Sequence, residues 1–540
     1  MADMKRRDFL KAGLAAGAAT AASGVLGKVS DPTERQSTAR PFELDEKTIG
    51  DLQDAMKAGS ETSESITLKY LQRIEEIDGM GPTLRSVIEI NPDALAIATA
   101  LDEERRTKGA RGPMHGIPVL IKDNIDTADK MMTTAGSVAM LGNIAAKDAF
   151  VASQLRKAGA VILGKTNLSE WANFRSTHSS SGWSGRGRQC RNPYILDRNP
   201  CGSSSGSGAA ASANLCAVAV GTETDGSVVC PSTTCGLVGV KPTLGMIPRT
   251  GIIPIAHSQD TAGPMARTVR DAAILLSVLA GRDSADPTDL FKAEKDYTKF
   301  LDKSGLKGAR IGVGRQFMGF NDAVDKIMEE TISAMKGLGA EIIDPADMNT
   351  VGQYDDSEFE VLLYEFKADL NKYMKGTPST VEAKSLEDLI RKNEELKDVE
   401  MPYFGQEIFE MAQEKGPLTD KAYLDALAKN HRLSREEGID ATMDEHKLDA
   451  IIAPTGSPGW TTDLLNGDHF TGGSSSPAAV SGYASLTVPA GFVGGMPVGV
   501  TFIGRAWSEA SLLKFAYAFE QETQVRRAPT FLSTMAAPAE

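Results

Sequence analysis

The chain has 540 residues, of which 41% are hydrophobic and 24% are charged, as in a globular protein large enough to bury a sizeable core. Its net charge is −14 at pH 7, and no block dense in Lys or Arg lies outside the first residues. This acidic balance argues against nucleic acid, and against an anionic membrane surface, as the main partner.

The N-terminal segment KRRDFLKAGLAAGAATAASG is basic and then weakly apolar. Paired Arg6 and Arg7, followed by Phe9-Leu10 and an Ala/Gly run, resemble a twin-arginine export signal; the alternative is a basic amphipathic helix. The run is too short and too rich in Ala and Gly to span a membrane. The sequence therefore predicts an export signal and linker at 1–35, and a periplasmic or secreted protein without a stable membrane anchor.

Helical and strand-like patterns alternate through the first half of the chain. In 63–79, Ile66, Tyr70, Ile74 and Ile77 recur at helical spacing. We expect further helices at 45–60 and 92–109, a buried strand in 116–126, and helix-then-strand units in 149–167 and 206–224. Units of this kind predict an α/β fold with a largely parallel or mixed sheet.

The second half repeats these patterns around a charged middle. Strands are predicted in 309–315, 340–345 and 448–456, and helices in 265–283 and 323–339. The stretch from about 354 to 446 is helix-rich and is predicted to be an insertion. The runs 478–491 and 496–504 and a helix at 508–523 close the fold. We therefore predict one large domain at 36–540, with a mixed, twisted sheet covered by helices on both faces.

The five cysteines are Cys190, Cys201, Cys216, Cys230 and Cys235. No pair has CxxC spacing, and no Cys/His cluster suggests zinc. The favoured interpretation is that they are small buried residues. Export would permit one or two disulfides, but the sequence does not assign them.

Two stretches rich in small residues draw attention as candidates for chemistry. GTETDGSVVCP places Ser227 just after a buried strand, where Gly226 allows a tight turn that exposes successive N–H groups. An ordinary strand-to-loop turn is the alternative. CGSSSGSGAAASA, from Cys201, reads as a flexible linker, a phosphate cradle, or part of a catalytic centre.

A rival assignment uses the same stretch. Residues 202–206 match GxSxG, the nucleophile elbow of α/β-hydrolases, which would make Ser204 the nucleophile. Such an enzyme needs a downstream His, and the candidates are His257, His431, His446 and His469. The preceding segment RNPYILDRNPC carries prolines and charges, so it makes a poor central strand.

Lys122 ends the apolar run IPVLI and precedes Asp123-Asn124. A lysine in this position is either a surface group with a buried stem or a desolvated base. Taken singly, Lys122, Ser203 and Ser227 each allow a structural and a catalytic interpretation. Only the motifs taken together can distinguish the two.

The ordered motifs GIPVLIKDN, GKTNLSEWANF, NPCGSSSGSGAAASA and GTETDGSVVCPSTTCGLVGVKPT, with LDAIIAPT and SLTVPAG near the end, resemble the amidase signature family. LSEWANF and TETDGSVVCP are most similar to bacterial peptide amidases, which remove the amide from peptide C-termini. The resemblance covers nearly all of the chain after 35, and it implies that the predicted α/β domain is a single amidase-signature domain.

The family's Ser-Ser-Lys triad maps by motif onto Ser227 as nucleophile, Ser203 as bridging serine and Lys122 as base. Ser203 lies 24 positions before Ser227, as the family spacing requires. The family also implies a cis peptide bond before Ser203. Asp225 and Val228-Val229 depart from the usual Gly-Gly-Ser-Ile-Arg, so the oxyanion hole is assigned only to the N–H groups of 224–227: Thr224, Asp225, Gly226 and Ser227.

The resemblance implies an amidase that converts carboxamides, including C-terminal peptide amides, to carboxylate and ammonia through an acyl-enzyme. The expected substrate is a small-molecule or short peptide amide, and no metal or organic cofactor is needed. Alternatives are an amidotransferase-type A subunit that supplies ammonia to a partner, and a non-catalytic exported solute-binding protein. The sequence does not fix the acyl group or the oligomeric state.

Overall fold

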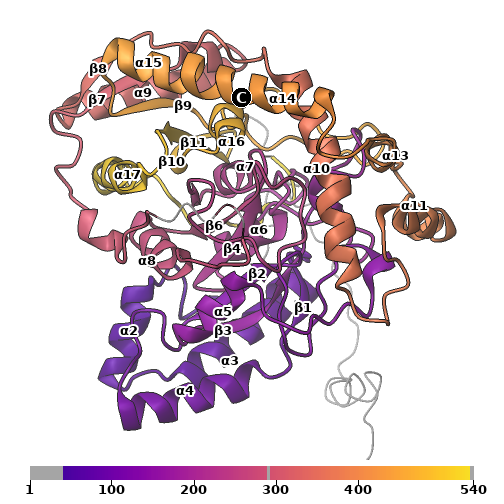
Figure 1. Ribbon diagram of the computed structural model, residues 1–540. Coiled ribbons are helices and arrows are strands. Elements are labelled where there is room, and N and C mark those ends of the chain that lie inside the picture. Colours follow the sequence, from indigo (N-terminus) through magenta and orange to yellow (C-terminus); the bar gives the residue numbers. More distant parts are fainter. Residues whose placement is uncertain (1–39, 287, 289–291, 536–540) are drawn as a thin grey trace, which may run out of the picture. The chain divides into compact units, whose positions relative to one another are not determined.

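A mixed sheet of 11 strands organises the chain in the computed structural model, which describes residues 40–286, 288 and 292–535 (Figure 1). The strand order is β1-β3-β2-β4-β6-β5-β10-β11-β9-β7-β8. The strands are β1 Val87–Ile90, β2 Pro118–Lys122, β3 Val161–Thr166, β4 Val218–Glu223, β5 Val238–Lys241, β6 Thr261–Ala266, β7 Arg310–Val313, β8 Glu341–Ile343, β9 Ala450–Pro454, β10 Ser485–Val493 and β11 Met496–Ile503. The predicted export signal lies outside the described residues.

Helices cover both faces of this sheet, as the sequence predicts. Helix α6 packs against β2, β3 and β4, whereas α8 packs against β4, β5 and β6, and α17 packs against β10. The helices are α2 Ile49–Ala58, α3 Ser63–Ile74, α4 Ala94–Lys108, α5 Phe150–Lys157, α6 Ser205–Ser212, α7 Val229–Thr234, α8 Val269–Leu279, α9 Asp322–Gly337, α10 Asp355–Lys375, α11 Leu386–Glu395, α12 Lys397–Glu400, α13 Glu407–Gln413, α14 Lys421–His431, α15 Asp440–His446, α16 Ser476–Ser481 and α17 Glu509–Thr523.

Parallel pairing at the centre of the sheet positions the candidate site. Strands β2 and β3, and β2 and β4, run parallel, so their carboxyl ends meet at one edge. Lys122 is the last residue of β2, and the turn that carries Ser227 follows β4. Strand β6, which pairs antiparallel with β4 and β5, contains Gly263 and Pro264 and is central even though its composition disfavours a strand.

Helix α6 owes its tight fit to its small residues. A Cβ on Gly206 would lie 2.3 Å from Ser86 O and 2.4 Å from Asn167 O, so no other residue fits there. Ser207 Oγ donates to Val220 O of β4 over 3.1 Å. The small-residue stretch is therefore a packed helix start and not a flexible linker.

Helices α10 to α15 lie between β8 and β9 in the chain and occupy the upper and right-hand parts of Figure 1. Helix α10 packs against α11, α13 and α14. A hydrophobic cluster joins Phe366 of α10 and Phe409 of α13 to Trp171 of the LSEWANF segment. This cluster fixes a loop near the serines against the helix-rich region.

Candidate active site

Lys122 ends β2 with its side chain fully buried. Its Nζ lies 2.8 Å from Ser203 Oγ and 2.9 Å from Thr222 Oγ1, and it donates to Thr222 O over 3.3 Å. Asn124 Nδ2 donates to the same Thr222 hydroxyl over 3.0 Å and so fixes its orientation. Lys122 is therefore not a surface group with a buried stem, because its amine ends on the hydroxyl of Ser203.

Burial controls the protonation of this amine. Desolvation lowers the pKa of Lys122 to about 7, while the charges of Asp260 and Glu223 act in the opposite direction. No carboxylate makes an ion pair with Nζ among the described residues. A large fraction of Lys122 is consequently neutral near pH 7 and able to accept a proton.

Ser203 sits in the turn before α6 and is fully buried. The peptide bond Gly202–Ser203 is cis, as the family resemblance implies. Ser169 N donates to Ser203 O over 3.1 Å, which ties the turn to the loop after β3. The Ser203 hydroxyl is thereby held against Lys122.

Ser227 lies in the turn between β4 and α7 and is half-buried. Gly226 has a φ of 75° and faces Ser475, whose Oγ would be 2.9 Å from a Cβ at that position. Glu223 Oε2 accepts hydrogen bonds from Val228 N and Val229 N, at the start of α7. This carboxylate and Gly226 shape a turn in which Ser227 stays accessible.

The predicted oxyanion-hole donors form a run of unused N–H groups. In the part of the chain that the structure describes, the N–H groups of Thr224, Asp225, Gly226 and Ser227 donate no hydrogen bond to the protein. Four successive backbone donors without partners can bind an oxyanion. Ser204 N donates to Ser227 O over 3.2 Å, so the two serine-bearing turns are in contact. No hydrogen bond joins the hydroxyls of Ser203 and Ser227 among the described residues.

Ser204, the nucleophile of the rival elbow assignment, is fully buried. Its hydroxyl donates to Thr222 O over 3.0 Å and accepts from Thr222 N over 3.1 Å. Within the described residues no hydrogen bond joins it to His257, His431, His446 or His469. A buried hydroxyl that already donates one hydrogen bond and accepts another is a poor nucleophile.

The sequence model of the Amidase family matches residues 65–513, which is most of the chain. The chain belongs to the amidase family. This amidase hydrolyses amide bonds, in keeping with its relatives. An Arabidopsis thaliana protein named as a probable amidase is 42% identical over 91% of this chain and 93% of its own length.

Two solved structures of peptide amidases are similar to this amidase. The native peptide amidase of Stenotrophomonas maltophilia is 49% identical, with a TM-score of 0.86, over 91% of this chain and 100% of its own. A peptide amidase in complex with the competitive inhibitor chymostatin is also 49% identical, with a TM-score of 0.87, over 90% of this chain and 100% of its own. The predicted α/β fold is confirmed by this likeness.

The N-terminus matches a second family model, that of the twin-arginine translocation signal, at residues 3–23. This match confirms the predicted signal and supports export of the amidase. In the range 40–535, apart from residues 287 and 289–291, no helix has the length and apolar character needed to cross a membrane.

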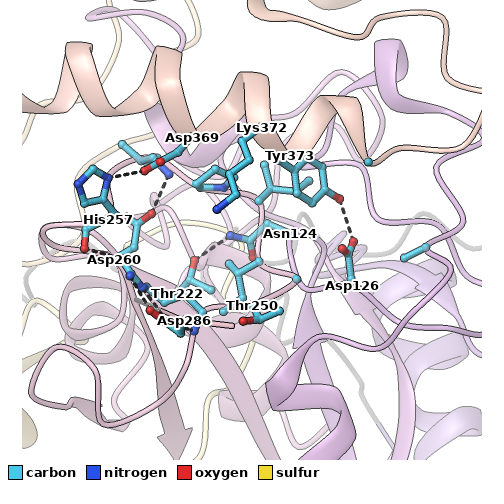
Figure 2. A pocket seen from close by; sticks show the side chains of 18 of the residues that line it. Asn124, Asp126, Thr222, Thr250, His257, Asp260, Asp286, Asp369, Lys372 and Tyr373 are labelled. Atoms are coloured by element: carbon cyan, nitrogen blue, oxygen red, sulfur yellow. Dashed lines mark hydrogen bonds and ion pairs between the residues drawn. The ribbon is translucent and has the colours of Figure 1, made fainter. Parts of the chain in front are cut away.

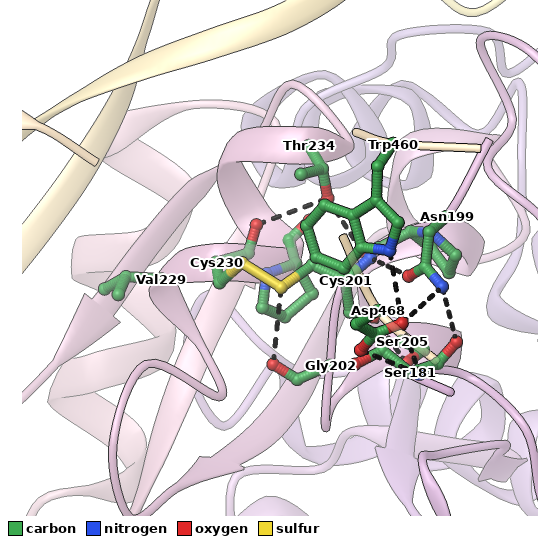
Figure 3. Close-up of a disulfide and its surroundings, with 12 residues drawn as sticks. Ser181, Asn199, Cys201, Gly202, Ser205, Val229, Cys230, Thr234, Trp460 and Asp468 are labelled. Carbon is green, nitrogen blue, oxygen red and sulfur yellow. Dashed lines mark hydrogen bonds between the residues drawn. A yellow bond between two sulfur atoms is a disulfide. The ribbon is translucent and has the colours of Figure 1, made fainter. Parts of the chain in front are cut away.

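A disulfide joins the two serine-bearing segments of the amidase (Figure 3). It links Cys201, two residues before Ser203, to Cys230, three residues after Ser227, and packs under the indole of Trp460. All five cysteines are buried, as predicted. Cys201 and Cys230 also form a disulfide of the kind that export permits, because the fold brings their α-carbons to 5.9 Å, whereas Cys190, Cys216 and Cys235 are free.

A cavity of about 850 Å³ adjoins the lysine side of the site (Figure 2). Asn124 and Thr222 line it, but Ser203 and Ser227 do not. Asp260, also in its wall, accepts from Thr224 Oγ1 over 2.6 Å, and burial raises its pKa to about 6. The cavity therefore reaches Thr222, one hydrogen-bonding partner of Lys122, and Thr224 of the predicted oxyanion-hole run, but not the predicted nucleophile.

One cluster of potential metal ligands occurs among the described residues, formed by His257, Glu365 and Asp369. His257 Nδ1 lies 2.7 Å from Asp369 Oδ2, and Nε2 lies 3.2 Å from Glu365 Oε1. Both ring nitrogens are thus already engaged by carboxylates. The cluster links the loop after β5 to helix α10.

Sequence reasoning missed Thr222, Asp260 and Glu358, which surround the candidate residues. Thr222 stands inside GTETDGS, and its spacing from Ser227 gives no sign that it contacts Lys122. Asp260 and Glu358 approach from distant segments, so only the tertiary structure reveals them. Asn124 lies in the quoted KDN motif, but its contact to Thr222 could not be read from the sequence.

Proposed function

We propose that this amidase hydrolyses the C-terminal carboxamide of short peptides to a carboxylate and ammonia, with Ser227 as nucleophile, Ser203 as proton relay and Lys122 as base. The observation that carries the proposal is the 2.8 Å contact between the buried Nζ of Lys122 and Ser203 Oγ. A buried amine placed on a serine hydroxyl has no evident structural purpose, whereas an activated serine requires a neighbouring base.

Acylation begins with neutral Lys122. Lys122 takes the proton of the Ser203 hydroxyl while Ser203 takes that of Ser227, and Ser227 Oγ bonds to the amide carbon. The N–H groups of residues 224–227 stabilise the oxyanion that forms. The proton then returns from Lys122 through Ser203 to the amide nitrogen, the C–N bond breaks, and ammonia leaves.

Deacylation repeats the relay with water in place of Ser227. Water gives a proton through Ser203 to Lys122 and attacks the ester carbon of the acyl-enzyme. The proton then returns from Lys122 through Ser203 to Ser227 Oγ as the bond between this oxygen and the acyl carbon breaks, which releases the carboxylic acid and restores Ser227. Ser203 and Ser227 are not hydrogen-bonded in the free enzyme, but catalytic hydrogen bonds often form only when substrate is bound. The contact of Ser204 N with Ser227 O keeps the two turns close enough for this step.

Three observations support short peptide amides as substrates and the periplasm as location. The similar structures are those of peptide amidases, and one of them holds chymostatin. Ser227 is half-buried, and Glu358 of the helical insertion contacts Asp225, two residues before it. The twin-arginine match supports passage across the inner membrane.

A panel of amides tests the proposal: acetamide, an aryl amide and an N-acetylated dipeptide amide, each scored for released ammonia. We expect the dipeptide amide to be hydrolysed most efficiently by the chain alone. Release that requires an added partner protein would favour the amidotransferase-type subunit, and binding without release would favour the solute-binding protein.

Labelling with a fluorophosphonate, followed by peptide mass spectrometry, tests the assignment of the nucleophile. We expect the label on Ser227, none in the Ser227→Ala variant, and normal labelling in Ser204→Ala. A label on Ser204 would establish the elbow assignment instead.

A further inference from the structure

Three ionisable side chains meet in the interior where helix α12 contacts the loop after β3. Glu170 and Arg175 belong to that loop, Glu400 ends α12, and all three side chains are buried. Arg175 Nε lies 2.8 Å from Glu170 Oε1, and Arg175 Nη2 donates to the backbone O of Glu400 over 2.7 Å. The guanidinium also lies 4.5 Å from the ring centre of Phe404. The cluster therefore joins the helix-rich region to the loop, and the proposed relay does not use it.

The cluster contains two carboxyl groups but only one guanidinium. If both carboxyl groups were ionised, it would carry a net negative charge that costs free energy to bury. Other charged groups nearby do not offset this charge. Arg186, next to Gly185 in the chain, pairs with Glu89 and Asp123, and the two other charged residues of α12, Lys397 and Asp398, are exposed. One proton on the pair of glutamates makes the cluster neutral.

The two carboxyl groups approach each other beside Gly185. Gly185 N donates to Glu170 Oε2 over 2.6 Å, and a Cβ on Gly185 would lie 3.0 Å from that oxygen and 2.5 Å from Glu400 Oε2. Glu400 Oε1 accepts from Ser137 Oγ over 2.9 Å and from Ala139 N over 3.0 Å. Glu400 Oε2, in contrast, has no donor among the described residues. A proton on Glu170 supplies that donor, because the two carboxyl groups are hydrogen-bonded to each other.

The electrostatic surroundings agree with a protonated Glu170. Burial raises the pKa of Glu170 well above its ordinary value, the charge of Glu400 raises it further, and Arg175 acts in the opposite direction. Because the two glutamates share the proton, they titrate as a pair.

The residue before Glu170 contacts the turn that carries Ser203. Ser169 N donates to Ser203 O over 3.1 Å. A Cβ on Gly202 would lie 2.2 Å from Ser169 Oγ, so the loop and the turn are packed without a gap. A shift of Glu170 is therefore transmitted to the peptide that holds Ser203 Oγ against Lys122.

We propose that Glu400 is a positioning residue for the reaction: through a proton that it shares with Glu170, it holds the loop that fixes Ser203 against Lys122. The inference rests on the proposed role of Ser203 as proton relay. Among the described residues Glu400 makes no hydrogen bond to Ser203 or Lys122, and no proton of the reaction passes through the pair.

The stability of Glu400→Gln tests the shared proton. The glutamine amide can still donate to Glu170 and accept from Ser137, but it needs no added proton. The native wild type then holds one proton more than the native variant, whereas both glutamates are ionised in the unfolded chains near neutral pH. The unfolding equilibrium constant of the wild type relative to Glu400→Gln should therefore rise about tenfold per pH unit, which is about a hundredfold from pH 6 to pH 8.

Glu407 of α13 provides a matched control at the same loop. It accepts from Ser176 Oγ and Thr177 N, and these hydrogen bonds outweigh burial, so its pKa is lowered. The stability ratio of the wild type to Glu407→Gln should consequently not change between pH 6 and pH 8. Infrared spectra give the same information without unfolding. At pH 8 the C=O band of one protonated carboxyl group should be present in the wild type and Glu407→Gln and missing from Glu400→Gln.

Single-turnover acylation of an N-acetylated dipeptide amide at pH 8 tests the positioning role. Glu400→Ala should lower the acylation rate by roughly tenfold to a hundredfold, the effect of a small misplacement of a catalytic group. Glu400→Gln should retain the rate of the wild type, because it keeps the hydrogen bond to Glu170. Glu407→Ala, which loosens the loop farther along the chain from Ser169, should also retain it. Thermal melting checks that each variant is folded.

Each other outcome has a definite meaning. A stability ratio for Glu400→Gln that does not change with pH, or no difference in the infrared band, would show that the pair holds no shared proton and would overturn the inference. Equal losses of acylation in Glu400→Ala and Glu407→Ala, or in Glu400→Ala and Glu400→Gln, would overturn it as well, because no specific positioning of Ser203 would remain. Failure of the wild type to hydrolyse the amide would contradict the proposed function, and the two measurements of the proton do not depend on that activity.

Discussion

At the scale of single residues, Lys122 determines how the rate should depend on pH. Burial lowers its pKa to about 7, and only the neutral amine can take the proton of Ser203. Acylation of a dipeptide amide in single turnover should therefore be fast above about pH 7 and should fall as the pH drops through that value. A rate that stays constant from pH 5 to 9 would exclude Lys122 as the base.

Two substitutions of Lys122 separate a base from a spacer. Lys122→Ala should lose several orders of magnitude in the acylation rate, the scale typical of a triad member, at a cost in stability of about 1–3 kcal/mol. Lys122→Arg should be equally inactive, because a guanidinium stays protonated. Thermal melting checks that both variants fold, and near-normal acylation by Lys122→Arg would rule out the relay.

The sequence was informative about residues wherever a motif carried the chemistry. Lys122, Ser203 and Ser227 could be proposed because spaced motifs occur together in the expected order. The pairing of Asp225 with Glu358 could not, because the two residues lie more than a hundred positions apart in the chain. Burial of Lys122 was foreseen only as one of two options, since its neighbours come from β4 and from the turn before α6.

At the scale of elements, the Cys201–Cys230 disulfide should stabilise the turn that holds Ser203 relative to α7. Closing a loop of 29 positions stabilises a fold by about 3.6 kcal/mol in the chain-entropy estimate. The double variant Cys201→Ala/Cys230→Ala should unfold at lower denaturant concentration and acylate more slowly. The matched control Cys190→Ala removes a free buried cysteine and should keep the acylation rate.

Reduction gives an independent check of the same element. Dithiothreitol should slow the wild type and Cys190→Ala but leave the double variant unchanged. An equal response of all three proteins would mean that the reductant acts elsewhere.

His257 joins the loop after β5 to helix α10 through Asp369 and Glu365. Burial lowers the pKa of His257, and so does the charge of Arg249. The hydrogen bond with Asp369 and the charges of the two carboxylates outweigh both effects, so the pKa is raised. The charged imidazole therefore stabilises the fold below the ordinary histidine pKa of about 6.5, and this contribution is lost as the pH rises through the raised value. The difference in unfolding free energy between wild type and His257→Gln should be larger at pH 6 than at pH 9. A difference independent of pH would contradict this account.

The elements show where periodicity predicts structure and where packing overrides it. The helices α3, α8, α9 and α17 follow from apolar spacing alone. Strand β6 was not predicted, because Gly263 and Pro264 disfavour a strand and only pairing with β4 and β5 stabilises it there. The run at 478–491 is divided between α16 and β10 because Gly482, with a φ of 71°, ends the helix.

At the scale of the whole molecule, export should depend on the paired arginines. Replacing Arg6 and Arg7 with Lys should leave the enzyme in the cytoplasm, because the twin-arginine signal is recognised by that pair. Cell fractionation followed by the amide assay measures the distribution. The variant should have the specific activity of the wild type in lysates, and unchanged periplasmic activity would contradict the role of the pair.

The tight packing of α6 against the sheet has a consequence for how relatives are recognised. Gly206 is required by the backbone of Ser86 and Asn167, and Ser204 and Ser207 serve hydrogen bonds to β4. Most of the small-residue motif therefore maintains the fold, and only Ser203 in it is proposed to move protons. A descendant that had lost Lys122 would have every reason to keep the motif, so a pseudoenzyme of this family would look intact in the stretch by which the family is most easily found. The lysine at the end of β2 is the better position to inspect when active and inactive members are sorted.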